Sequence, residues 1–211
     1  MLKLKTFTYP VQAFSANTYL LIDELNNCIV IDPGQKGHEL RDHLLASGLN
    51  VKAILLTHTH FDHMRGVMSL VEQFDCDVYA HHIDVLLFQN PEFNRYCPTD
   101  EPLVLPDNIK FVEDNENLKL LDAEIKVLHT PFHTKGSVIY LIPALNIVFT
   151  GDTLFKGSIG RSDLFGSDPF VIADSLRIFK SLPKSLIVLP GHGEMTTLEE
   201  ELAENLYLVY A

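Results

Sequence analysis

Three histidines and an aspartate fall within six residues of this chain. The stretch HTHFDH occupies residues 58–63 and directly follows the apolar run 53–56. In an extended segment, side chains two residues apart point the same way, about 6.5 Å apart, so His58 and His60 can reach one cation. If the chain then turns into a helix, Asp62 and His63 move to one side and can hold a second cation about 3.5–4 Å from the first. The spacing therefore predicts a site for two metal ions.

Three further segments carry residues of metal-ligand type. Each follows a short apolar run that has the pattern of a buried strand, at 125–128, 147–149 and 186–189. The residues are His133 in the sequence TPFHT, Asp152 in TGDT and His192 in PGHG. Loops at one edge of a sheet are where functional sites are usually assembled. The four segments are therefore expected to meet, and the glycines among them permit close backbone approach.

Taken together, the four segments resemble the motifs of the metallo-β-lactamase-fold hydrolases, and within them those of the glyoxalase II (hydroxyacylglutathione hydrolase) branch. Their order and approximate spacing cover nearly the whole chain. The resemblance implies two metal sites joined by Asp152. It assigns the first cation to His58, His60 and His133, and the second to Asp62, His63 and His192. It also implies that Asp32, in the sequence IDPG at 31–34, supports the ligand loop without touching a metal.

The sequence departs from that family pattern at several points. Phe132 stands where glycine is usual, and the tripeptide 64–66 replaces a smaller one. Two-domain glyoxalase II enzymes carry a helical C-terminal domain for glutathione, whereas only 19 of the 211 residues follow His192. We therefore expect one hydrolase domain over 1–211 without that helical domain. The sequence GRSD at 160–163 lacks the family's glutathione-binding tyrosine and resembles short bacterial members and persulfide dioxygenases.

Composition limits the possible partners and the cell compartment. A chain of 211 residues with 46% hydrophobic residues suffices for one enzyme domain. The formal net charge of −12 disfavours nucleic acid and anionic membranes as partners. An odd number of cysteines, at 28, 76 and 97, without a CxxC pair fits reduced thiols, and no export signal is visible. We expect a cytoplasmic protein with a small-molecule substrate, and the sequence carries no prediction of oligomeric state.

The order of apolar patterns predicts two similar halves. In the first half, strands are expected at 2–8, 18–22, 28–31, 51–56 and 78–80, with helices at 39–46 and 64–74. In the second, strands are expected at 109–112, 125–128, 138–142, 147–149 and 186–189, with a helix at 169–181 and a capping box from Thr197 to Glu200 before a last helix. This order permits, and the family resemblance implies, an α/β fold of four layers, an αββα sandwich.

One long segment and five histidines have more than one interpretation. Residues 81–117 hold four prolines and several aromatic residues, which favours either a loop that covers the pocket or a plain surface connection. The remaining histidines are expected at the surface or behind the ligands; they are His38, His43, His81, His82 and His129.

The expected chemistry is hydrolysis of a thioester. A hydroxide that bridges two divalent cations, held by Asp62 and Asp152 among others, would attack a carbonyl such as that of S-lactoylglutathione and release an acid and a thiol. Zinc is the expected metal, with iron or manganese as alternatives. Three basic residues near the ligands could bind an anionic acylglutathione, and Arg161 is favoured over Lys135 and Lys156.

Other functions of the fold stay open. A persulfide dioxygenase shares the Gly-Arg-Ser/Thr-Asp element and uses a single iron, although the full set of seven ligands favours hydrolysis. A lactonase is a second alternative, and a non-catalytic metal-binding module is a third. A β-lactamase with a cysteine ligand is disfavoured, because no cysteine lies in a ligand motif.

Overall fold

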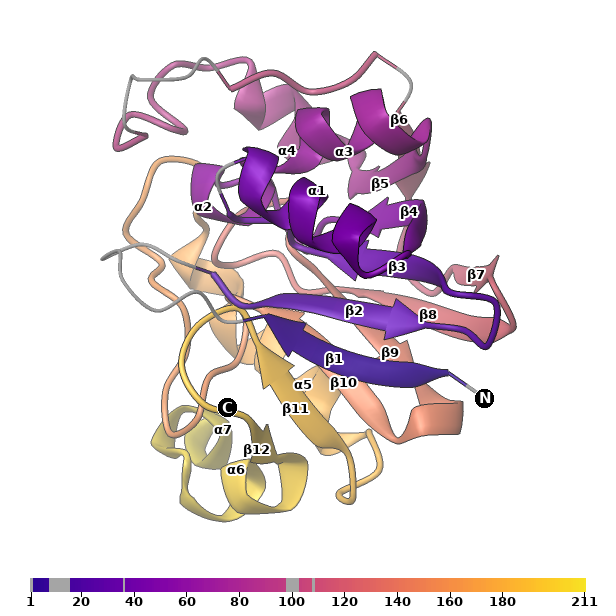
Figure 1. The fold of residues 1–211 in the computed structure, drawn as a ribbon. Coiled ribbons are helices and arrows are strands. Elements are labelled where there is room, and N and C mark those ends of the chain that lie inside the picture. Colours follow the sequence, from indigo (N-terminus) through magenta and orange to yellow (C-terminus); the bar gives the residue numbers. More distant parts are fainter. Residues whose placement is uncertain (1, 8–15, 36, 98–102, 108) are drawn as a thin grey trace.

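Two six-stranded sheets packed face to face form the centre of the computed structural model, which describes residues 2–7, 16–35, 37–97, 103–107 and 109–211 (Figure 1). The first sheet has the order β1 (Lys3–Phe7), β2 (Thr18–Ile22), β3 (Asn27–Ile31), β4 (Asn50–Leu55), β5 (Asp77–His81) and β6 (Ile109–Val112). The second has the order β12 (Thr196–Thr197), β11 (Ile187–Pro190), β10 (Ile147–Gly151), β9 (Val138–Ile142), β8 (Ala123–His129) and β7 (Asn117–Leu120).

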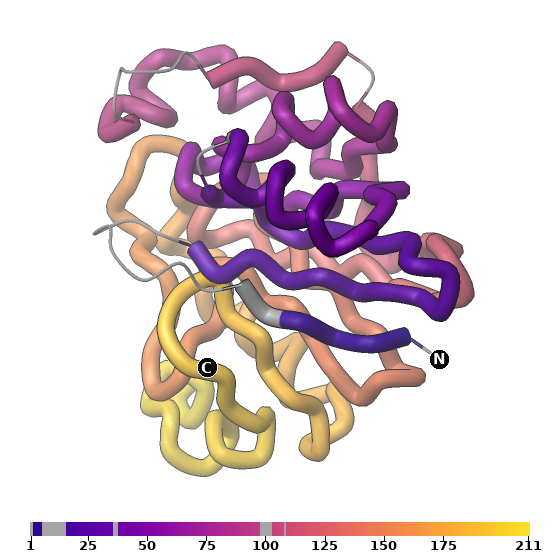
Figure 2. Tube along the Cα trace, viewed as in Figure 1, coloured from indigo at the N-terminus to yellow at the C-terminus, as the bar shows by residue number. Residues whose placement is uncertain are grey.

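Helices lie on the outer faces of both sheets. The first sheet carries α1 (Gly37–Ala46), α3 (Val67–Phe74) and α4 (His82–Phe88), and the second carries α5 (Ile172–Lys180), α6 (Leu198–Glu204) and α7 (Leu206–Tyr210). Short elements are α2 (Phe61–Met64), η1 (Pro143–Leu145) and η2 (Pro169–Val171). Figure 2 shows the first half of the chain, indigo to magenta, above the second half, orange to yellow. The predicted four-layer αββα sandwich is confirmed.

Both faces of the central strands are covered, which explains their continuous apolar sequences. In β3, Ile29 and Ile31 pack between the two sheets, whereas Cys28 and Val30 pack against the outer helices. A third apolar cluster joins the second sheet to α5, α6 and α7. A strand buried on two sides reads as an unbroken hydrophobic run rather than as an alternation.

The helix predicted at 64–74 is interrupted. The structure has α2 and α3 with a break at Arg65 and Gly66. The Gly66 amide donates a hydrogen bond to the carbonyl oxygen of Pro33 at 2.7 Å, and a Cβ on Gly66 would lie 2.9 Å from that oxygen. The loop that follows β3 therefore occupies the place where a continuous helix would pass.

Three other predictions need correction. The strand at 109–112 belongs to the first sheet, where it pairs in parallel with β5, and not to the second half. Residues 81–117 are not one loop, because they contain α4, β6 and the start of β7. The predicted capping box at Thr197 is present and opens α6, but α6 is not the last helix, because α7 follows it. Within the described part of the chain, no helix has the length and apolarity needed to cross a bilayer.

The topology brings the ligand segments to one edge. Strands β3, β4, β5 and β6 run parallel to one another, so their carboxyl ends lie at the same edge of the first sheet. In the second sheet β10 and β11 are also parallel, and they end just before Asp152 and Gly191. The Val138 amide donates to the Thr57 carbonyl at 2.9 Å, which ties the two edges together. The predicted site residues follow these strand ends.

Candidate metal centre

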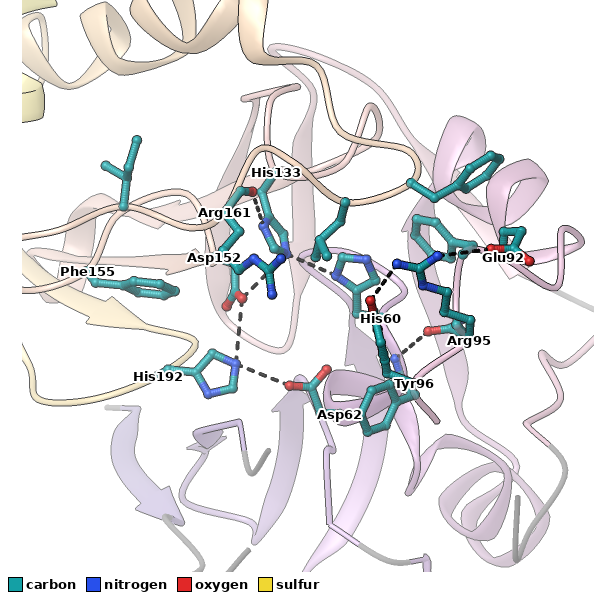
Figure 3. A pocket seen from close by; sticks show the side chains of 16 residues that line it. His60, Asp62, Glu92, Arg95, Tyr96, His133, Asp152, Phe155, Arg161 and His192 are labelled. Carbon is teal, nitrogen blue, oxygen red and sulfur yellow. Dashed lines mark hydrogen bonds and ion pairs between the residues drawn. The ribbon is translucent and has the colours of Figure 1, made fainter. Parts of the chain in front are cut away.

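All seven predicted ligand side chains meet between the two sheet edges. Their ligand atoms form three overlapping groups, and within each group the atoms lie within 4.8 Å of one another. The groups are His58, His60 and His133; His58, His63 and Asp152; and Asp62, His63 and His192. Figure 3 shows His60 and His133 on one side of Asp152, and Asp62 and His192 on the other. The four segments thus form one centre.

Asp152 lies between the two sides of this centre. Its Oδ1 is 3.3 Å from Nε2 of His63, and its Oδ2 is 3.4 Å from Nε2 of His133 and 3.6 Å from Nε2 of His192. The two oxygens of this one carboxylate therefore face imidazoles from both sides of the centre. This position is compatible with the bridging role that the family resemblance implies for Asp152.

Asp32 holds the ligand loop from behind. It accepts hydrogen bonds from the Thr57 amide at 2.8 Å, the Thr57 hydroxyl at 2.6 Å and Nδ1 of His63 at 2.9 Å. Because the Thr57 hydroxyl gives its only proton to Asp32, it accepts from Nδ1 of His58 at 3.1 Å. Both histidines thus carry their proton on the outer nitrogen, and the Nε2 atoms face the centre.

The second motif is fixed in a similar way. Nδ1 of His133 donates to the carbonyl oxygen of Arg161 at 2.8 Å, while its Nε2 lies 3.0 Å from Nδ1 of His60. The backbone after β10 and the side chain after β8 are therefore joined by one hydrogen bond. Such a bond fixes the ring orientation and the tautomer of a metal-ligating histidine.

One buried acid behind the centre was not predicted. Asp84, in the first turn of α4, accepts hydrogen bonds from the Thr59 amide at 3.0 Å, the Thr134 hydroxyl at 2.9 Å and the Gly136 amide at 2.8 Å. It therefore joins the loop of the first motif to that of the second. Burial raises the pKa of Asp84 to about 6, against the effect of the three donors. In the sequence it is only one acid at a helix start, so no local signal separates it from a surface residue.

Two glycines are required by close approach. A Cβ on Gly191 would lie 2.3 Å from Oδ1 of Asp152. Gly151 has a φ of +47°, and a Cβ there would lie 2.3 Å from Oγ1 of Thr57. A side chain at either position would push apart the residues that form the centre.

Three imidazoles of the centre are neutral at pH 7. Burial, together with neighbouring imidazoles, lowers the pKa of His58 well below its usual range and that of His60 to about 3. Burial also lowers the pKa of His133. Neutral rings with lone pairs directed inward are the form in which histidine binds a metal.

On the other side of the centre, carboxylates lie beside imidazoles and shift their pKa values. Burial opposes ionisation of Asp62 and Asp152, but their imidazole neighbours lower the pKa of both. Burial likewise opposes protonation of His63 and His192, but the pKa of each is raised, mainly by Asp152. Two carboxylates thus hold protons on nearby rings, and a cation at this place would displace those protons.

The buried polar atoms of the centre fit divalent cations. Nε2 of His58 and Oδ1 of Asp152 are buried and have no hydrogen-bond partner. Buried polar atoms are almost always paired, so these two atoms call for a ligand between them. Imidazole nitrogens with carboxylate oxygens suit zinc, iron and manganese alike.

A cavity of about 620 Å³ opens over the centre. Residues 92–96 line one wall, and Phe155 and Arg161 lie in the other (Figure 3). The Phe93 ring stacks on His60 at 4.7 Å, and Oδ1 of Asn94 accepts from the Phe61 amide at 2.8 Å. This part of segment 81–117 therefore forms a pocket wall, while residues 98–102 of the segment lie outside the described part.

The predicted substrate residues divide into two groups. Arg161 lines the cavity, with its guanidinium paired to Asp163 at 2.9 Å. Lys135 is exposed and Lys156 pairs with Glu194 at 2.8 Å, and neither is among the residues that line the cavity. We predicted the lysines near the ligands because they directly follow the motifs in the sequence. The chain turns after each motif, so residues that are close in sequence to a ligand are not close to the cavity. Phe132, the departure from the family pattern, is buried in the core beneath the second sheet.

Comparisons with known proteins identify relatives over nearly the whole chain. Residues 11–192 match the sequence model of the metallo-beta-lactamase superfamily. The hydroxyacylglutathione hydrolase GloC of Haemophilus influenzae is 35% identical over 204 residues, which are 94% of this chain and 95% of that protein.

Solved structures show the same fold. The B3 metallo-beta-lactamase BLEG-1 superposes with a TM-score of 0.87 at 33% identity, over 98% of this chain and 99% of that one. The protein TTHA1623, solved in a di-iron-bound form, superposes with a TM-score of 0.80 at 36% identity, over 96% of this chain and 100% of that one.

Proposed function

The chain belongs to the metallo-β-lactamase superfamily, and from this premise we propose that it is a thioester hydrolase of the glyoxalase II type. Its substrate would be an acylglutathione such as S-lactoylglutathione, cleaved to a carboxylic acid and a thiol. The observation that carries the proposal is the position of Asp152, whose two oxygens face imidazoles of both ligand groups beneath an open cavity.

The seven residues are arranged for two cations. His58, His60 and His133 would hold one, and Asp62, His63 and His192 the other, with Asp152 between them. Two divalent cations, when bound, would supply Lewis acidity and lower the pKa of a coordinated water to about 7. The work of the protein is to keep the ligands in place. Asp32 does this for His63 and, through Thr57, for His58.

The cavity suits an anionic substrate with an apolar reacting part. Its volume of about 620 Å³ lies within the range of small-molecule sites. Arg95 and Arg161 place guanidinium groups on opposite walls, where they can bind carboxylates, and Phe93 and Phe155 add apolar surface to the lining. A thiol with a pKa of about 8.5 leaves readily, so the site needs no strong general acid. The resemblance to GloC, over nearly the whole chain, supports this choice of substrate class.

Two observations require that other activities be tested as well. The similarity to the B3 metallo-beta-lactamase BLEG-1 makes a β-lactam a necessary comparison substrate. The di-iron form of TTHA1623 and the sequence GRSD at 160–163 make iron and a persulfide dioxygenase the competing proposal.

The test combines elemental analysis of the purified protein with a panel of substrates. We expect two metal equivalents per chain and rapid release of thiol from S-lactoylglutathione, lost on chelation and restored by the metal. A lactone and a β-lactam should turn over slowly. One iron per chain with oxygen uptake on glutathione persulfide would overturn the proposal in favour of a dioxygenase, and faster turnover of the lactone or β-lactam would replace the thioester.

A further inference from the structure

A second group of metal-type side chains lies further along the same sheet edge. Strand β5 ends at His81 and α4 begins at His82. The neighbouring parallel strand β6 ends at Val112, which pairs with His81, so Glu113 follows at the adjacent strand end. Parallel strands thus bring His81, His82 and Glu113 together in the way that the central ligands are brought together.

These three side chains converge. Nδ1 of His82 lies 3.1 Å from Oε1 of Glu113, and Nε2 of His81 lies 3.9 Å from Oε2. One ligand atom from each residue lies within 4.8 Å of the other two. Separations of this size are compatible with three ligands around one ion at bond lengths of about 2.0–2.2 Å.

Two ring nitrogens face Glu113, one from His81 and one from His82. Nε2 of His81 faces Glu113, and an ion bound there would require the ring proton on Nδ1, so that His81 would give up the long 3.4 Å contact from the Ile83 amide that caps α4. Nδ1 of His82 is buried and has no hydrogen-bond partner, because its contact with Glu113 lacks hydrogen-bond geometry. An unpaired buried nitrogen beside a carboxylate is a second indication of a bound cation.

A third histidine holds the first in place. The ring of His129, at the end of β8, stacks on His81 with centroids 4.3 Å apart and an angle of 11°. Nε2 of His129 donates to the Lys135 carbonyl at 2.9 Å, and the His129 backbone amide donates to Oδ1 of Asp114 at 2.9 Å. His129 therefore packs against the group and is not a ligand. Burial, with His129 and His82 as neighbours, lowers the pKa of His81 to about 4, so this ring is neutral at pH 7.

We propose that His81, His82 and Glu113 form a third, peripheral site for a divalent transition ion, with water completing the coordination. Two imidazoles and one carboxylate favour zinc, nickel or copper over magnesium and calcium, which prefer oxygen ligands. The Glu113 side chain is 62% exposed and that of His82 is 41% exposed, so the ion exchanges with solvent more easily than one in the central group.

The experiment starts from protein that carries its central metals. Excess metal is removed, and Zn²⁺ binding is then measured by titration calorimetry and by metal analysis after equilibrium dialysis. We expect one additional, weaker equivalent in the wild type. His82→Ala and Glu113→Gln should each weaken that equivalent at least tenfold, while the central metals and the turnover of the loaded enzyme stay unchanged. His38→Ala, an exposed histidine on α1, is the matched control and should keep the additional equivalent.

A second readout identifies the ligands. With Cu²⁺ as the probe, the electron paramagnetic resonance spectrum should show coupling to two imidazole nitrogens in the wild type and to one in His82→Ala. His81→Ala is not the primary variant, because its ring also caps α4. The proposal is overturned if the wild type takes up no additional ion, or if the additional equivalent survives in both His82→Ala and Glu113→Gln. In either of those cases His82 and Glu113 form only a surface ion pair.

Discussion

The central group around Asp152 and the peripheral group of His81, His82 and Glu113 lie at the same sheet edge but differ in what surrounds them. In the central group the His63 side chain is fully buried and that of Asp152 is 11% exposed, whereas Glu113 is 62% exposed. Parallel strand ends can collect metal-type residues twice. The peripheral group also contacts the second sheet through His129, but its Glu113 faces solvent.

The two groups also differ in how their rings are supported. In the central group the outer nitrogen of His63 bonds to a carboxylate, and that of His133 bonds to a backbone carbonyl. In the peripheral group the His81 nitrogen opposite Glu113 only caps a helix, with a long contact of 3.4 Å. A hydrogen bond from the outer ring nitrogen to a fixed acceptor orients a metal-ligating histidine, and this distinguishes a permanent, reactive centre from a weak surface site. The predictions below test that difference.

The largest effect is expected at the bridging carboxylate. Asp152→Ala should lower kcat/KM for the thioester by about 10³-fold or more, because it removes several kcal/mol of charge stabilisation at both ions. Initial rates and metal content would measure this. Glu113→Gln is the control carboxylate and should leave the rate within about twofold, since it lies in the peripheral group. Full activity with both metals retained in Asp152→Ala would contradict the central role given to this residue.

The next largest effect is expected at Asp32, which accepts a hydrogen bond from Nδ1 of His63. Asp32→Asn should weaken metal binding at the central group by about 10- to 100-fold, the usual loss when a residue behind a ligand is changed. Competition with a chromophoric chelator would measure the affinity. Asp77→Asn, an exposed acid that pairs with Lys110, is the matched control. An unchanged affinity in Asp32→Asn would mean that burial alone holds His63.

Asp84 connects the backbone segments of the central and the peripheral group, because it lies two residues after His82 and accepts a hydrogen bond from the Thr59 amide. Its substitution therefore tests this connection. Because its folded pKa of about 6 exceeds the unfolded value of about 3.9, its contribution to stability is full below about pH 4 and is lost as the pH rises through 6. Asp84→Asn lacks this titration. The unfolding free energy of the wild type relative to this variant should fall by about 1 kcal/mol between about pH 5 and about pH 7.5.

Urea unfolding at several pH values would measure that difference. In addition, Asn cannot accept at its amide nitrogen, so one of the Thr59 or Gly136 amides loses its partner, at a cost of about 1–3 kcal/mol. Asp77→Asn serves again as the control and should change stability by less than about 0.5 kcal/mol. A pH-independent difference would show that Asp84 does not titrate in this range.

The smallest effect is expected in the cavity wall. Arg161→Ala should raise KM for S-lactoylglutathione about tenfold or less, with kcat nearly unchanged, because its exposed guanidinium acts on the substrate as a charge. Added salt should reduce the difference. Lys156→Ala removes the same charge outside the cavity lining and is the control. Equal effects of the two substitutions would assign the change to net charge and not to a contact.

The sequence located much of the central group because its members stand at strand ends. His58, His133, Asp152 and His192 each follow an apolar run, and such runs predict strands whose ends share an edge. The same logic could have brought together His81, which ends β5, and Glu113, which follows β6. It did not, because the strand at 109–112 was assigned to the second half and was therefore not placed beside the predicted strand at 78–80.

What the sequence alone determined is the position of each ligand segment and of most strands, because these follow from local hydrophobic periodicity and turn residues, while the four-layer class was implied by the family resemblance. The tertiary structure decided which strands are neighbours, where α2 and α3 separate, how Asp84 joins two loops, and that Arg161 but not Lys135 or Lys156 lines the cavity. These features depend on contacts between residues far apart in the chain, such as Gly66 with Pro33 and Asp84 with Gly136. Local pattern carries no record of such contacts, since packing sets them only when the sheets close.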